Sequence, residues 1–119
     1  MVYKLAVGTV DGVNITEHFG KCKQFLIIEI SQETSEILMK EFRFTEYSNT
    51  CGEHDIKRIE NKLSAIKDCH IVLVSKLGGH SEKLLIHHGI IPLISHGSIE
   101  DALYKIVKFY KKYIFVRRE

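Results

Sequence analysis

Residues 71–74 form an uninterrupted run of apolar and mostly β-branched side chains, Ile-Val-Leu-Val. Such a run is typical of a strand that is buried on both faces, as in parallel sheets covered by helices. Before it, apolar residues recur at helical spacing, at Ile56, Ile59, Leu63 and Ile66. A helical segment that leads into a doubly buried strand predicts an α/β domain with right-handed crossovers between parallel strands.

The remaining patterns extend this unit in both directions. Four strand-like segments come first, at residues 3–7, 13–15, 25–30 and 37–44, and Asp11-Gly12 is a hairpin signal between the first two. A short helix after Leu77 is expected to end at Gly89, and a strand follows at 91–94. Ser98 is the predicted cap of a last helix, whose apolar face is Ile99, Ala102, Leu103, Ile106 and Tyr110. The sequence thus predicts a three-layer α/β domain with a mixed sheet, the order ββββαβαβα and an antiparallel meander at its start.

Length and charge restrict the class of protein. The 119 residues suit one domain, which we expect to span 1–110, followed by a short basic tail at 111–119. Residues 105–119 hold six basic residues and one acidic residue, too small a patch to indicate nucleic-acid binding. No apolar run approaches the ~20 residues that cross a bilayer, and the N-terminus lacks a signal-peptide pattern. We expect a cytoplasmic protein that binds neither nucleic acid nor membrane, with its three cysteines as thiols, ligands or packing residues.

The first candidate site is a polar loop that contains His18, Phe19, Gly20 and Cys22. Gly20 allows a ligand to approach the backbone closely. Imidazole and thiolate are ligands that suit iron or an iron–sulfur cluster. The alternative is a surface histidine beside a small buried thiol.

The second candidate is Cys51 with His54 at the start of a predicted helix. Thr50 and Glu53 form a capping box, which places Cys51 at the first helical position. The helix dipole favours a thiolate there, and a residue three positions later shares the same face. Cys51 and His54 are therefore candidate metal ligands, although the cap could also be purely structural.

The third candidate is the turn formed by Gly78, Gly79 and His80 after the buried strand. Ligands of α/β sheets collect at such turns, and free N–H groups at a helix start suit an anion. Cys69 is expected to be a packing residue, and His87 and His88 are expected to be helix-end histidines. The sequence lacks the standard motifs of zinc hydrolases, thioredoxins and serine hydrolases.

Several of these segments, in the same order, resemble one known family. They are Glu17-His18-Phe19-Gly20, residues 25–29, Cys51-Gly52-Glu53-His54, Asp68-Cys69 and residues 77–79 through 89–90. Over about residues 2–109 the chain resembles the dinitrogenase iron–molybdenum cofactor biosynthesis family, which includes NifX, NifY and the C-terminal part of NifB. The resemblance implies a ribonuclease-H-like fold without nuclease activity, and it implies that His18 is a ligand of an iron–sulfur precursor.

Three functions remain in competition. The first is a non-catalytic carrier of an iron–sulfur or iron–molybdenum-type cluster, which a partner protein would donate or accept. Its metal ligands would come from His18, Cys22, Cys51 and His54, with cofactor contacts from Phe19, Gly20, Gly78, Gly79 and His80. The second is a thiol-dependent enzyme with Cys51 as nucleophile and His54 as base. The third is a metal-free regulatory module that binds an anion at Gly78 and Gly79.

Overall fold

The computed structural model describes residues 2–45 and 55–109, with five strands in one mixed sheet. The strands are β1 (Val2–Gly8), β3 (Gln24–Ser31), β4 (Ile37–Phe44), β5 (Ile71–Val74) and β6 (Ile91–Ile94). Their order across the sheet is β4-β3-β1-β5-β6. β1 and β4 each run antiparallel to β3, whereas β5 runs parallel to both β1 and β6. The predicted mixed sheet and α/β class are confirmed, and the ribonuclease-H-like label stays a prediction.

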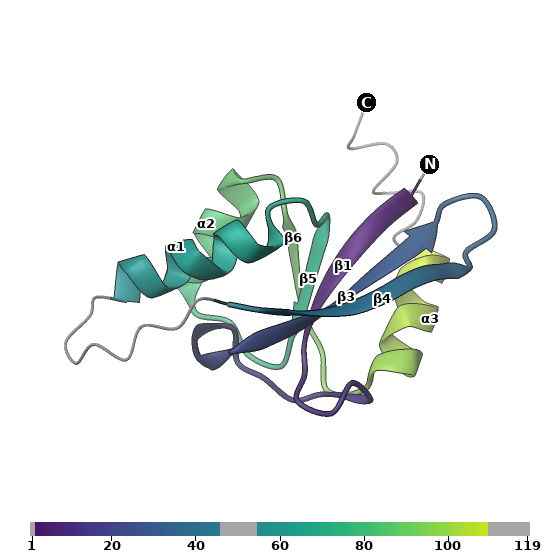
Figure 1. The fold of residues 1–119 in the computed structure, drawn as a ribbon, viewed down its shortest axis with the longest axis horizontal. Coiled ribbons are helices and arrows are strands. Elements are labelled where there is room, and N and C mark those ends of the chain that lie inside the picture. Colours follow the sequence, from purple (N-terminus) through teal and green to yellow (C-terminus); the bar gives the residue numbers. More distant parts are fainter. Residues whose placement is uncertain (1, 46–54, 110–119) are drawn as a thin grey trace.

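Helices cover both faces of the sheet. Figure 1 shows α1 (Asp55–Ile66) and α2 (Gly79–His87) on one face and α3 (Ile99–Phe109) on the other. Alternate residues of β1 supply the two cores: Leu5 and Val7 pack with α3, and Ala6 packs on the side of α1 and α2. None of the helices in the described residues is long and apolar enough to cross a membrane.

Local sequence signals account for several element ends. All four residues of β5 are at most 1% exposed, as expected of a strand covered on both faces. Gly89, just after α2, has φ +78°, a conformation that favours glycine. The Ser98 hydroxyl accepts the Asp101 N–H at 3.1 Å and so caps α3 as predicted. The predicted helix start at Thr50 and Cys51 lies outside the described residues.

The predicted four-stranded meander is wrong in its second strand. β2 (Asn14–Ile15) does not pair with β1; it pairs antiparallel with β7 (Gly97–Ser98) in a separate two-stranded ribbon. The Asp11 carboxylate accepts the N–H groups of Val13 and Asn14 and so turns the chain as expected. The neighbour of β1 in the sheet is β3, because β2 leaves the sheet to meet a segment more than 80 positions away in the chain.

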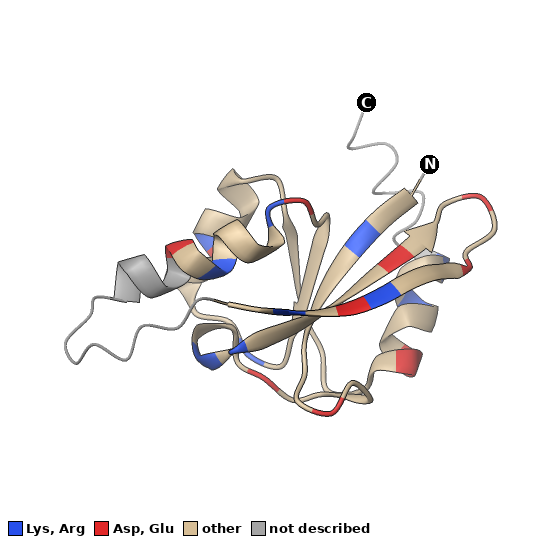
Figure 2. Cartoon of the chain, viewed as in Figure 1, with Lys and Arg blue, Asp and Glu red and all other residues tan. Residues whose placement is uncertain are grey.

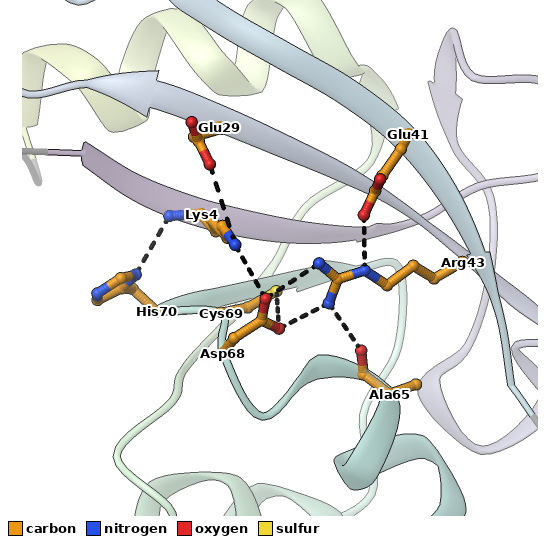
Figure 3. Close-up of polar contacts among 8 residues, drawn as sticks. All are labelled: Lys4, Glu29, Glu41, Arg43, Ala65, Asp68, Cys69 and His70. Atoms are coloured by element: carbon orange, nitrogen blue, oxygen red, sulfur yellow. Dashed lines mark hydrogen bonds and ion pairs between the residues drawn. The ribbon is translucent and has the colours of Figure 1, made fainter.

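A group of charged side chains fastens the end of α1 to the sheet (Figure 3). Arg43 on β4 donates two hydrogen bonds to Asp68, at 2.6 and 3.0 Å, and a third to the Ala65 carbonyl at 3.1 Å. Lys4 on β1 donates to the same carboxylate at 3.0 Å. These bonds fix the C-terminal turn of α1 against β1 and β4.

Candidate functional site

The loop that carries His18 closes over the carboxyl end of β1. The carbonyl of Gly8, the last residue of β1, accepts the N–H groups of Thr16 and Glu17, each at 3.2 Å. A Cβ on Gly8 would lie 3.0 Å from the Val74 side chain and 3.2 Å from the Glu17 Cβ. Glycine at this position therefore lets the loop lie against the end of β5.

The same loop then pairs with the chain just beyond β5. The Ser75 N–H donates to the Glu17 carbonyl at 3.0 Å, and the Phe19 N–H donates to the Lys76 carbonyl at 2.9 Å. His18 and Lys76 thereby form a parallel bridge. Two of the predicted sites, the His18 loop and the turn after β5, are thus parts of one edge of the sheet.

We call this edge the carboxyl rim; it comprises residues 16–20, 75–79 and 95–97. Phe19 anchors it, because its fully buried ring packs beside Phe25 with 6.0 Å between ring centroids. A short 3-10 turn, η1 (Phe19–Lys21), follows. His18 and Gly20 on either side of the buried ring are exposed. The sequence therefore folds so that the imidazole of His18 faces solvent from a fixed loop.

The start of α2 lies on the same rim. Gly78 takes the N-cap position, and a Cβ on Gly78 or Gly79 would meet no heavy atom within 4 Å among the described residues. The N–H groups of a first helical turn lack partners within the helix and carry the positive end of its dipole. The described residues therefore leave room for an anionic group to approach this turn.

Charged side chains of both signs lie near the rim. Lys21 and Lys76 are exposed, one on the His18 loop and one on the turn after β5, while Glu17 precedes His18 and Glu82 lies in the first turn of α2. Figure 2 shows basic and acidic positions along the loop that joins β2 to β3. The two lysines and the start of α2 can attract an anionic ligand.

Cys22, a predicted metal ligand, lies in the core below the loop. It is 1% exposed, and its thiol donates to the Gln24 carbonyl at 2.7 Å. Burial raises the pKa of this thiol to about 12, so it is protonated at neutral pH. Cys69 is likewise buried, as expected of a packing residue, and burial raises its pKa to about 12.

Cys51 and His54, the other two predicted ligands, lie outside the described residues, and their role stays a prediction. Within residues 2–45 and 55–109, no three His, Cys, Asp or Glu side chains are grouped so that they could hold one metal ion. The imidazole of His18 is therefore an exposed donor on the rim, and the described residues alone do not complete a closed metal site around it.

His80, the second residue of α2, lines a groove of about 520 Å³ between α1 and α2. Leu63 and Leu84 form its apolar part, and His88 lines it as well. The Nδ1 atom of His88 lies 2.8 Å from the Leu84 carbonyl, an arrangement that suits the helix-end role expected of it. The groove thus shares with the rim only the first turn of α2.

One exposed rim residue was absent from the sequence-based candidates. His96 follows β6 directly after Ser95, whose N–H donates to the Val74 carbonyl at 3.0 Å. The signal was available, because the carboxyl ends of parallel strands meet at one edge and His96 follows a predicted strand.

Comparison with known proteins agrees with this architecture. The family model of the dinitrogenase iron–molybdenum cofactor matches residues 1–108. The chain is 33% identical over 113 residues to the FeMo cofactor biosynthesis protein NifB of Herbaspirillum seropedicae, covering 92% of this chain and 20% of that protein. It is 26% identical over 113 residues to the protein NifX of Sinorhizobium fredii, covering 91% of this chain and 70% of that protein.

A solved structure has the same fold. It is a dinitrogenase-type protein of Methanocaldococcus jannaschii, with a TM-score of 0.60, 16% identity and coverage of 96% of this chain and 92% of that one. This chain spans about a fifth of the length of the NifB protein and most of the NifX protein. The match to the family model over nearly the whole chain shows that this protein belongs to the dinitrogenase iron–molybdenum cofactor family.

Proposed function

We propose that this protein is a non-catalytic carrier of an iron–sulfur or iron–molybdenum-type cluster, acting in cofactor biosynthesis or a related process. The observation that carries the proposal is the parallel bridge between His18 and Lys76. It puts an exposed imidazole beside a lysine and the start of α2. An imidazole ligand in this open setting suits an anionic cluster that supplies most of its own ligands.

The relatives support a role of this kind. A protein named FeMo cofactor biosynthesis protein NifB and a protein named NifX each match this chain over about nine-tenths of its length. A carrier must also release its cargo, and an open rim with few protein ligands favours transfer to or from a partner protein. The cluster is therefore cargo in this proposal, and the fold does not depend on it.

The test is anaerobic loading of the purified protein with ferrous iron and sulfide, followed by iron analysis and visible absorption. The proposal predicts a brown protein with sulfide-to-iron charge-transfer bands and bound iron that survives gel filtration. Failure to retain any iron, together with tight binding of an inorganic anion such as phosphate, would instead support the metal-free regulatory module. Turnover of an electrophilic substrate that alkylation of Cys51 abolishes would support the thiol-dependent enzyme.

A further inference from the structure

We infer that His96 is a second protein ligand of the cluster that His18 binds, an inference that rests on the proposed function. The two histidines lie on two chain segments, which we call arms, that form hydrogen bonds with opposite sides of the end of β5. On one arm, the Ser75 N–H donates to the Glu17 carbonyl, next to His18. On the other arm, the Ser95 N–H donates to the Val74 carbonyl, next to His96. β5 therefore ends between the two histidine-bearing segments.

Beyond the end of β5 the two arms meet. Ile15 of β2 pairs with Gly97 of β7 in an antiparallel register. Residues 17–19 then run parallel to the end of β5 on one side, whereas Ser95 pairs with β5 on the other side. The two histidine-bearing arms are therefore two strand spacings, about 10 Å, apart at the end of β5.

Both histidines are exposed, as is Lys76 beside His18. Phe19, the neighbour of His18, is buried in the core on the side of α1 and α2 and so fixes this arm against the end of β5.

Two imidazoles and a lysine make an incomplete site for a single ion, because a closed zinc-type site needs three or four protein donors. They suffice for a polynuclear metal–sulfur cluster, whose sulfides complete the coordination of each iron. With an imidazole on each side and Lys76 near one of them, an anionic cluster is held at two points. Two-point attachment distinguishes a cluster from a free ion or a small anion.

The experiment compares wild type with His18→Ala, His96→Ala and the double variant, each loaded anaerobically with ferrous iron and sulfide. His87→Ala, which removes an exposed imidazole at the far end of α2, is the matched control. His96→Gln keeps a polar side chain of similar size, and thermal melts of the apo proteins verify that every variant is folded. Bound iron, cluster affinity and pulsed-EPR couplings to histidine nitrogen in the reduced state are measured.

The inference predicts two histidine nitrogens coupled to the wild-type cluster and one in each single variant. It also predicts affinity at least about tenfold lower in His96→Ala and His96→Gln, the lower bound for disturbed metal sites. Wild-type couplings and affinity in His96→Ala would overturn the role of His96 and leave His18 and the proposed function intact. A folded wild type that retains no cluster would overturn the proposed function and this inference together.

Discussion

His18 and Lys76 pair in parallel at the carboxyl end of the sheet, although one precedes β3 and the other follows β5. This single pairing joins two segments that the sequence presents as separate candidate sites. Backbone hydrogen bonds on both sides of the bridge, from Ser75 to Glu17 and from Phe19 to Lys76, fix its register. The position of His18 therefore depends on backbone geometry, and variants that move the loop are expected to disturb the site.

Gly8→Ala is expected to disturb the loop from below. The new Cβ would lie 3.0 Å from the Val74 side chain and 3.2 Å from Glu17, so the loop or β5 must shift. We expect unfolding free energy to fall by about 1–3 kcal/mol, the usual cost of overpacking. Gly20→Ala is the control: its Cβ meets no described atom within 4 Å, and we expect a change within about 0.5 kcal/mol. Equal stability of both variants in denaturant titrations would show that the loop does not rest on Gly8.

The ion pair between Arg43 and Asp68 predicts a pH-dependent contribution to stability. Hydrogen bonds from Arg43 hold the pKa of Asp68 well below its usual range. The stabilisation is thus fully present above the unfolded-state pKa of about 4 and is lost as the pH falls toward the lower folded-state pKa. Both side chains are partly exposed, 26% and 40%, so solvent screens the pair and Asp68→Asn should cost about 0.5–1 kcal/mol at neutral pH.

Denaturant titrations at several pH values check this expectation. The difference between wild type and Asp68→Asn should be constant from neutral pH down to about pH 5 and should shrink below it. Glu36→Gln, at an exposed turn position, is the control and should show no such dependence. A difference that grows on acidification would contradict the proposed sign.

The buried thiols predict a simple labelling result. Burial raises the pKa values of Cys22 and Cys69 to about 12, so few thiolates form at mildly alkaline pH. In a Cys51→Ser variant we expect neither remaining cysteine to react with a thiol reagent in the folded protein and both to react in denaturant. Rapid labelling of Cys22 in the folded protein would show that the loop opens and that Cys22 is accessible to a metal.

The sequence predicts those elements whose patterns are local. Residues 71–74 are a strand as predicted, because an uninterrupted apolar run reflects burial on both faces. Residues 37–44 are also a strand as predicted, although the alternating apolar side chains of Leu38, Phe42 and Phe44 are exposed. The Ser98 cap and the turn at Gly89 are likewise set by neighbouring residues. The partner of β2 is not local: the Asp11 turn forms as expected, but Asn14 and Ile15 find their neighbours at Gly97 and Ser98.

The candidate site likewise combines features that local sequence patterns predict with features that depend on distant segments. The pattern around His18 identifies a loop with a possible ligand, and the structure leaves that imidazole exposed. Residue type alone made Cys22 a candidate ligand, but its burial depends on Phe25 and other core residues from distant segments. His96 was overlooked although it follows a predicted strand, β6, which runs parallel to β5 and so ends at the same edge of the sheet.

The most direct test of the carrier proposal is the dissociation constant of the cluster for wild type and His18→Ala. An anaerobic donor cluster is titrated into each folded apo protein, with His87→Ala as the control. We predict that His18→Ala binds at least about tenfold more weakly, with loss of charge-transfer absorption, and that His87→Ala matches wild type. Unchanged affinity and absorption in His18→Ala would contradict the assignment of this rim as the cluster site.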